Sequence, residues 1–233
     1  MHLLTKSESS PKLARYTGNR FAGAILYLAS GTYKRELCPA AGSCLKTCLI
    51  DKAGRGGFDP KVRAARRRKT DLYYADRPLF MQLLRKDIDA LIRSATKIGQ
   101  VPVIRLNGGS DLDWSEIYAE YKGRVMFWEY TKRPDLAFKL KAMGVHVTFS
   151  YSENTTPRLL QALFERNINV AVVMQVKKGK ELPQYFQGMP VIDGDLHDYR
   201  FLDRTGCVIG LRLKSTRRPT TEQVSGGFVQ GAA

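Results

Sequence analysis

The sequence has no apolar run that approaches the roughly 18 residues needed to cross a bilayer. Its first residues also lack the apolar segment and the cleavage site of a secretory signal. These absences argue against a membrane or secreted protein, and we expect a cytoplasmic one. Cysteines stay reduced in that compartment, so clustered thiols there indicate metal ligands or catalytic groups rather than disulfides.

Acidic residues are scarce, since 22 Asp and Glu stand against 38 Lys and Arg, which gives a net charge of +16. This excess favours polyanionic partners, of which nucleic acid is the obvious candidate. The largest basic block comprises Arg63, Arg66, Arg67, Arg68 and Lys69. Smaller blocks comprise Lys177, Lys178 and Lys180, and Lys214, Arg217 and Arg218. We expect the first block to form a helix that contacts a nucleic-acid backbone, although a solvated helix face would show the same pattern.

Apolar runs alternate with helical patterns along most of the chain, and no other repeat is visible. The runs at 22–29, 101–106, 124–130, 145–150, 169–176, 189–192 and 207–213 predict strands. Alternation of this kind predicts an α/β protein with a parallel sheet covered by helices. Six or seven strands fit a doubly wound sheet or a partial barrel. A complete eight-stranded barrel usually needs about 250 residues, so we expect a partial (β/α)6-type TIM-like barrel with mostly parallel strands.

The length of 233 residues and a hydrophobic fraction of 43% are sufficient for one domain with a sizeable core. Residues 1–20 are polar, and we expect them to form an N-terminal arm. Residues 21–215 would form the barrel domain. Residues 216–233 are rich in Thr, Ser and Gly, and we expect a flexible C-terminal tail.

Three of the four cysteines, Cys38, Cys44 and Cys48, fall within eleven consecutive positions after the first predicted strand. A four-thiolate zinc site usually has two C-x-x-C-like pairs far apart in the sequence, and this chain has none. Three local thiolates suit an iron–sulfur cubane that leaves one iron open to a small ligand. The alternatives are buried apolar cysteines and a structural zinc site completed by Cys207 or a histidine. We expect Cys207 to be a plain core or surface thiol, because it begins the last strand.

Polar residues at the carboxyl ends of the predicted strands are further site candidates, because α/β proteins bind ligands there. Arg105 must be paired or face a ligand if it points inward. Arg212 could bind a phosphate or a carboxylate. Asp113 is expected to cap the helix that begins at Trp114. A magnesium-dependent nuclease that uses Asp111, Asp113, Asp193 and Asp195 is a further possibility, but it leaves the three cysteines unexplained.

The three-cysteine loop after the first strand of a partial α/β barrel resembles the radical S-adenosylmethionine (SAM) superfamily. The second strand ends in the segment 107–111, which is similar to the glycine-glycine-glutamate motif of that superfamily. Polar residues after the fourth strand resemble its ribose or carboxylate ligands, and Val208–Leu211 resembles its glycine-bearing strand beside the adenine. The order of these features matches across residues 22–213. The cysteine spacing is C-x5-C-x3-C, where the superfamily usually has C-x3-C-x-x-C.

The wide cysteine spacing, the following segment 53–56 and the segment 105–114 resemble uncharacterised phage-encoded proteins, which are distant radical-SAM-like relatives. The resemblance implies that Cys38, Cys44 and Cys48 bind a [4Fe–4S] cluster, and that SAM binds the open iron and is cleaved with an electron from an external donor. The cofactor-binding residues that it implies are Asn107, Gly108, Gly109, Ser110, Asp111, Ser150, Ser152 and Arg212.

The charge adds a polyanionic, nucleic-acid-like substrate to this prediction, reached in the host cytoplasm if the protein is phage-encoded. The alternative is a binding protein that keeps a metal centre without catalysis and uses its basic face on nucleic acid.

Overall fold

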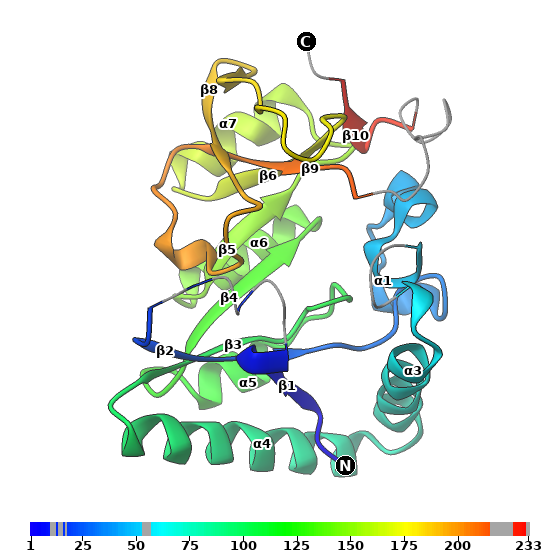
Figure 1. Cartoon of the computed structure of the whole chain (residues 1–233), viewed down its shortest axis with the longest axis vertical. Coiled ribbons are helices and arrows are strands. Elements are labelled where there is room, and N and C mark those ends of the chain that lie inside the picture. Colours follow the sequence, from blue (N-terminus) through cyan, green and yellow to red (C-terminus); the bar gives the residue numbers. More distant parts are fainter. Residues whose placement is uncertain (10–12, 14–15, 17, 53–56, 215–225, 232–233) are drawn as a thin grey trace.

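The computed structural model describes residues 1–9, 13, 16, 18–52, 57–214 and 226–231. In this part of the chain, seven parallel strands form a twisted sheet in the order β2, β3, β4, β5, β6, β9, β8 (Figure 1). Their bounds are β2 Phe21–Leu26, β3 Val101–Arg105, β4 Met126–Thr131, β5 His146–Ser150, β6 Asn169–Met174, β8 Met189–Asp193 and β9 Val208–Arg212. The predicted α/β fold with mostly parallel strands is therefore confirmed.

Short antiparallel strands lie at both edges of this sheet. β1 (Leu4–Lys6) pairs with β2, and β7 (Tyr185–Phe186) pairs with β8. No pairing among the described residues joins these two edges, so the sheet is open where a complete barrel would close. β9 lies between β6 and β8 in the sheet, although β8 precedes β9 in the sequence. The last strands therefore depart from the simple order in which each strand is added beside the previous one.

Helices follow the strands from β2 to β5. After β2 come α1 (Leu49–Lys52), α3 (Pro60–Ala75) and α4 (Arg77–Lys97), and the later connections hold α5 (Ser115–Glu120), α6 (Pro134–Ala142) and α7 (Pro157–Glu165). Strands that step in one direction with the usual right-handed crossovers place their helices on one face. Buried residues of α4 to α7 accordingly share one core with the strands. No helix of the described ranges is long and apolar enough to cross a membrane.

The two faces of the sheet have separate cores. On β3, Ile104 packs in the helix-side core and Val103 packs on the opposite, inner face, as the two-residue strand period requires. An aromatic cluster with ring centroids 5.0–5.8 Å apart covers the inner face at the amino-terminal halves of β2 to β4. It consists of Tyr16, Phe21, Trp128, Tyr199 and Phe201. Room for a ligand on the inner face therefore remains only toward the carboxyl ends.

Both ends of the chain contain a short strand that the sequence did not predict. The predicted N-terminal arm contains β1, which pairs with β2 from Leu4 opposite Leu26 to Lys6 opposite Ala24, and the preceding Leu3 is fully buried. In the predicted tail, residues 215–225 lie outside the described residues, but β10 (Val229–Gln230) pairs in parallel with the end of β6. Apolar side chains explain both differences, because Leu3 and Val229 gain by burial.

Candidate functional site

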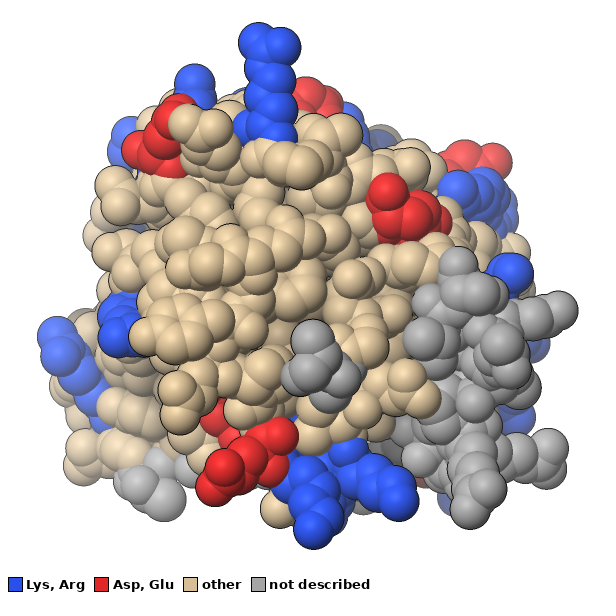
Figure 2. All heavy atoms as spheres, turned by 90° about the horizontal axis from the view of Figure 1, so that it is seen from above, with Lys and Arg blue, Asp and Glu red and all other residues tan. Residues whose placement is uncertain are grey.

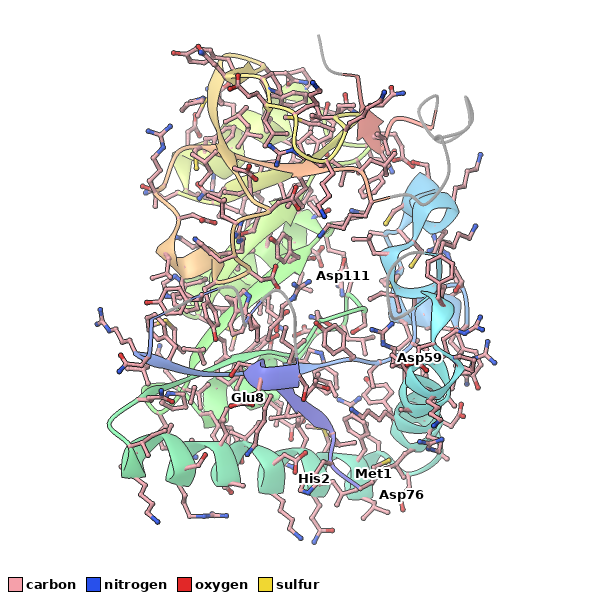
Figure 3. The ribbon with its side chains drawn as sticks, viewed as in Figure 1. Met1, His2, Glu8, Asp59, Asp76 and Asp111 are labelled. Atoms are coloured by element: carbon pink, nitrogen blue, oxygen red, sulfur yellow. The ribbon has the colours of Figure 1, made fainter. Side chains whose placement is uncertain are left out.

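A cavity of about 470 Å³ opens at the carboxyl ends of the parallel strands. Residues 38–52, here called the cysteine segment, form one wall, together with Arg66 of α3. The opposite wall comes from the loop after β3, the end of β4, Ser150 of β5 and residues 211–214, which span the end of β9 and the two residues after it. Figure 3 shows Asp111 between the sheet and the cysteine segment. The cavity therefore lies where the sequence predicted the site.

All three clustered cysteines line this cavity. The Cys38 Sγ lies 3.6 Å from the carbonyl oxygen of Gly109, so the cysteine segment touches the loop after β3. Burial raises the pKa of Cys38 to about 12. Burial also raises the pKa of Cys44, and the nearby Lys132 ammonium opposes that shift. A metal that binds these thiols must therefore displace protons.

Glu153, in the loop after β5, anchors the cysteine segment. Its carboxylate accepts hydrogen bonds from Ser43 N at 2.7 Å and from Ser43 Oγ at 2.8 Å, at the start of a 3-10 helix (Gly42–Thr47). Gly42 has a φ of +51°, and a Cβ there would lie 2.3 Å from Glu153 Oε1. The segment therefore needs glycine at this position for its backbone conformation and for the approach of Glu153.

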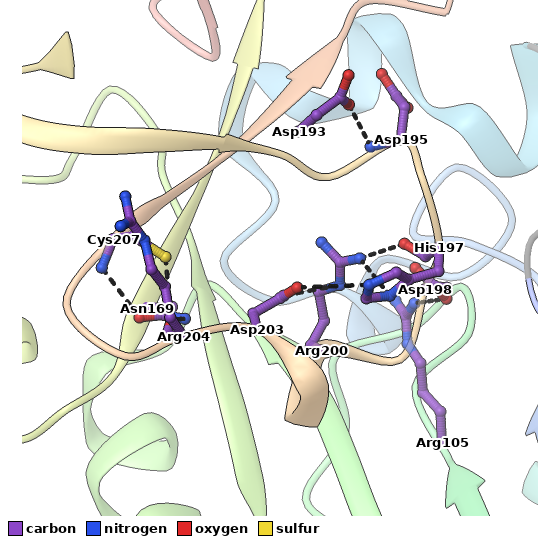
Figure 4. A network of polar contacts seen from close by, with 10 residues as sticks. All are labelled: Arg105, Asn169, Asp193, Asp195, His197, Asp198, Arg200, Asp203, Arg204 and Cys207. Atoms are coloured by element: carbon purple, nitrogen blue, oxygen red, sulfur yellow. Dashed lines mark hydrogen bonds and ion pairs between the residues drawn. The ribbon is translucent and has the colours of Figure 1, made fainter. Parts of the chain in front are cut away.

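Within the described ranges, no three side chains of His, Cys, Asp or Glu lie close enough together to hold a single metal ion. This finding gives no support to a structural zinc site or to the magnesium-dependent nuclease. Cys207 is a buried core thiol on the inner face, as predicted, and its Sγ lies 3.1 Å from the Arg204 carbonyl oxygen (Figure 4). A cubane cluster binds its thiolates through different irons, so it does not require three ligands around one ion.

Two adjacent glycines of the loop after β3 lie against β2. A Cβ on Gly108 would lie 2.5 Å from Ile25 Cγ2 and 2.7 Å from the Leu26 carbonyl oxygen. A Cβ on Gly109 would lie 3.0 Å from Ile50 and 3.2 Å from the Leu28 carbonyl oxygen. Close packing alone is thus a sufficient reason for both glycines. It also brings their backbone to the wall of the cavity.

The Asn107 side chain organises the same loop. Its Oδ1 accepts hydrogen bonds from Ser110 Oγ at 2.9 Å, Leu112 N at 3.0 Å and Trp114 Nε1 at 3.1 Å, and its Nδ2 donates to the Leu112 carbonyl oxygen at 3.0 Å. The polar atoms of this side chain are therefore used inside the loop. Asn107 and Ser110 line the cavity, but their side chains primarily fix the shape of the loop.

Asp111 and Lys132 lie side by side in the cavity wall. Asp111 Oδ2 accepts a hydrogen bond from Lys132 N at 3.0 Å, whereas its buried Oδ1 has no hydrogen-bond partner among the described residues. Burial raises the pKa of Asp111 and lowers the pKa of Lys132. The Lys132 ammonium donates to Ser150 Oγ and lies 4.3 Å from the centre of the Phe228 ring. The sequence offered one signal for Lys132, a charge directly after a buried strand.

Glu129 holds the loop after β3 from outside the cavity. Its buried carboxylate accepts hydrogen bonds from Leu106 N at 2.6 Å, Asn107 N at 3.0 Å and the Tyr118 hydroxyl at 2.7 Å. Burial raises the pKa of Glu129 to about 7, and Arg105 and these donors oppose the rise. Glu129 therefore positions the backbone that faces the cysteine segment.

Arg105 lies deeper in the cavity and is ion-paired, as predicted for a buried charge. Its guanidinium contacts Asp198 Oδ2 at 3.0 Å (Figure 4) and donates to the Asn107 carbonyl oxygen at 3.0 Å. It also lies 4.4 Å from the centre of the Tyr130 ring. Sequence reasoning missed Asp198, since no local pattern reveals the contact of a loop after β8 with β3.

The other predicted site residues lie apart from the thiols or are already paired. Ser152 does not line the cavity, and its backbone N donates to Thr155 Oγ1 at 3.0 Å. Arg212 lines the cavity, but its guanidinium contacts Asp193 at 2.8 Å and Asp195 at 3.3 Å. Asp113 lies outside it, where it accepts from Ser115 N at 2.9 Å near the start of α5 and pairs with Lys139 at 2.7 Å. Of the four acids of the predicted nuclease site, Asp111 and Asp195 line the cavity, and Asp113 and Asp193 do not.

The largest basic block divides on α3. Arg66 donates to the Ile50 carbonyl oxygen at 2.9 Å and lines the cavity, and Lys69 donates to the Leu3 carbonyl oxygen at 2.6 Å. Burial lowers the pKa of both side chains. The remaining members are exposed: Arg63, Arg67 and Arg68. Of the smaller blocks, Lys177, Lys178, Lys180 and Lys214 are exposed, and residues 217–218, like the segment 53–56, lie outside the described residues.

A family model described as gene product 88 matches residues 2–228. The match includes the cysteine segment, the loop after β3 and Phe228, so the whole wall of the cavity lies within it. No curated protein and no solved structure matches the chain.

Proposed function

Because the chain belongs to the gene product 88 family, whose description names no activity, we propose its function from the cavity. We infer an iron–sulfur enzyme of the radical-SAM type, built on a sheet that corresponds to a partial (β/α)6-type TIM-like barrel. Cys38, Cys44 and Cys48 would hold a [4Fe–4S] cluster. SAM would occupy the adjoining part of the cavity.

One observation carries this proposal. The three thiols line the same cavity as the backbone of Gly108 and Gly109, at the carboxyl ends of adjacent strands β2 and β3. Had the thiols faced another side of the sheet, a shared cofactor site would have been impossible. In the described ranges no three potential ligands surround one point, and a cubane, unlike a single zinc ion, does not require that arrangement.

The donor set fits this group in two further respects. The buried Asp111 Oδ1 has no partner in the described structure, so it can accept a hydrogen bond from a ligand amine. Burial raises the pKa of Cys38 and Cys44, which favours the protonated form of these two thiols. Cluster binding would therefore release protons. When bound and reduced by an external donor, the cluster would supply the electron that cleaves SAM.

The chain itself would bind and orient the cofactor. The backbone of residues 108–110 and the Asp111 carboxylate would hold the amino group of SAM. Lys132 and Ser150, which already share a hydrogen bond, would face its carboxylate or ribose. Arg212, held by Asp193 and Asp195, would complete the wall rather than act as a free cation. Phe228 would exclude water at the rim.

The substrate that we propose is a nucleic-acid-like polyanion. The net charge of +16 supports this class. Arg66 lines the cavity, and the bond that fixes its guanidinium goes to the neutral Ile50 carbonyl oxygen. Because this hydrogen bond does not involve a carboxylate, it leaves the positive charge of Arg66 unneutralised, and that charge can attract an anionic substrate.

Anaerobic reconstitution of the full chain with iron and sulfide tests the cluster. We expect a brown protein with about four irons per chain, as a cubane requires. Addition of SAM and a reductant should then release 5′-deoxyadenosine. A brown protein that leaves SAM intact would favour the non-catalytic alternative. A colourless protein that holds one zinc would refute both.

Cys207 offers a matched control for the three cavity cysteines. Cys38→Ala, Cys44→Ala and Cys48→Ala should each reduce the bound iron strongly, because each removes one of three ligands. Cys207→Ser should leave the iron content unchanged, because that thiol packs with Ala171 and Ile209 away from the cavity. An equal loss of iron in the Cys207 variant would contradict the assignment of the ligands.

A further inference from the structure

The outer face of α3 carries a concentrated positive charge. The helix contains six basic residues and a single acid, Asp71. Two of the six turn inward, as described above. The other four are exposed: Lys61, Arg63, Arg67 and Arg68. The carboxylate of Asp71 accepts a hydrogen bond from the Tyr33 hydroxyl at 2.8 Å, so the acid is already engaged.

Aromatic rings lie among these cations. The Arg67 guanidinium lies 5.0 Å from the centre of the Tyr33 ring, and the Lys34 ammonium lies 4.1 Å from the centre of the Tyr74 ring. Tyr33 and Tyr74 remain 38% and 39% exposed. A cation held against a ring fixes its orientation, and the exposed part of the ring stays accessible. These contacts therefore present two oriented rings beside a row of cations.

This combination of groups matches the chemistry of a single strand of nucleic acid. Cations neutralise the phosphates, and exposed aromatic rings stack on unpaired bases. A duplex hides the faces of its bases, so it would use only the charge. Among the described residues seen in Figure 2, the Lys and Arg side chains lie mostly around the rim of a large uncharged area, unlike the concentrated cations of α3.

The surface also adjoins the cavity. Figure 1 shows α3 next to the part of the chain that holds α1 and the cysteines. Arg66 projects from α3 into the cavity wall, where its guanidinium lies 5.0 Å from the centre of the Tyr27 ring. A single strand of nucleic acid bound along α3 would therefore lie close to the mouth of the cavity.

We propose that the exposed face of α3, together with Tyr33 and Lys34, binds single-stranded nucleic acid. This inference rests on the proposed function in one respect: it takes the bound nucleic acid to be the substrate of the proposed enzyme. Binding itself requires neither the cluster nor SAM, so the two proposals can fail separately.

Fluorescence anisotropy of the full chain without cluster tests the binding. The probes are labelled DNA and RNA single strands of about 16 nucleotides, and a duplex of equal length. We expect the single strands to bind more tightly than the duplex at equal salt. Comparison of the DNA and RNA probes identifies the preferred sugar. A duplex bound as tightly as both single strands would overturn the proposal, because charge alone would then explain the binding.

Two pairs of variants separate stacking from charge. Tyr33→Leu and Tyr74→Leu should each weaken binding about fivefold or more, whereas Tyr33→Phe and Tyr74→Phe should keep most of the affinity. The triple variant Arg63→Gln, Arg67→Gln and Arg68→Gln should reduce the salt slope by about 2. The matched control is Lys177→Gln, Lys178→Gln and Lys180→Gln, which removes the same charge from another exposed segment.

The control variant should change the affinity much less than the α3 variant, and thermal melting should show that all of these variants fold. An equal loss in both charge variants would overturn the proposal, as would Leu variants that bind like the wild-type chain. If the chain binds single strands as expected but never assembles a cluster, the surface assignment stands and the proposed enzyme fails. If it cleaves SAM without binding single strands, the reverse holds.

Discussion

The two ends of the inner sheet face are built in opposite ways, although the same strands cross both. At the amino ends, the aromatic cluster packs ring against ring. At the carboxyl ends, the cavity holds thiols, Asp111 and Lys132, whose pKa values are shifted by burial. On β4, Trp128 belongs to the cluster and Tyr130, two residues later, lines the cavity. One end stabilises the fold, and the other carries buried polar groups, of which Asp111 Oδ1 costs free energy because it has no hydrogen-bond partner among the described residues.

The largest stability effect is expected in the aromatic cluster. Trp128→Ala should lower the free energy of unfolding by about 3–5 kcal/mol, because it removes a fully buried ring and leaves a void. Urea unfolding measures this loss. Tyr185→Ala is the control, since Tyr185 is 65% exposed, and it should change stability by less than about 0.5 kcal/mol. If both variants lost a similar free energy of unfolding, the aromatic cluster would not be the main source of stability that we infer.

Glu129 sharpens the comparison through pH. Its pKa rises from an ordinary 4.5 to about 7 in the fold, so the unfolded chain releases this proton first as the pH increases. The contribution of Glu129 to the free energy of unfolding should therefore fall by up to about 3 kcal/mol between these pH values. Glu129→Gln should remove this part of the pH dependence. Urea unfolding at several pH values tests it, and parallel profiles for the two chains would contradict the expectation.

Gly108 tests how tightly the cavity wall is packed. Gly108→Ala should lower the free energy of unfolding by about 1–3 kcal/mol, because the added Cβ would meet Ile25 and the Leu26 backbone at less than contact distance. Thermal unfolding measures the change. Gly231→Ala provides the control, because a Cβ at that position meets nothing within 4 Å. If the two variants are equally stable, the loop after β3 must shift at little cost to make room for the added Cβ.

Asp111 should show the smallest effect on stability. Asp111→Asn removes a buried charge but keeps an oxygen for the Lys132 N–H group, so stability should stay constant or increase by less than about 1 kcal/mol. Affinity for SAM should decrease, because the carboxylate no longer faces the ligand amine. Thermal melting and SAM titration of the reconstituted protein measure the two effects. A strongly destabilised variant would show that Asp111 serves the fold rather than the ligand.

Much of the secondary structure was predictable from local signals. Pro134 and Gly144 enclose α6 at Pro134–Ala142, and Thr156 with Pro157 begins α7, which are helix start and stop signals of the sequence itself. Apolar runs located the seven parallel strands. The short strands β1, β7 and β10 were missed, because two or three residues carry too short a pattern to recognise. The place of β9 between β6 and β8 was equally hidden, since strand order depends on long-range pairing.

The site was predictable in its location but less so in its details. The three cysteines, Gly108, Gly109, Asp111 and Ser150 line one cavity, because carboxyl ends of parallel strands meet at one edge. The Asn107 side chain finds its partners within its own loop, a detail that its place after a strand does not reveal. Glu153 and Asp198 gain their importance from contacts between distant segments, which no pattern in the sequence reveals.

The position of β10 has a consequence for biosynthesis. Residues 229–230 pair with the end of β6, and Phe228 beside them lines the cavity. A ribosome that has added only the first 214 residues has already synthesised every cysteine, but Phe228 and β10 are still missing from the cavity and the sheet. The cavity wall can therefore be completed only after β10 has left the exit tunnel.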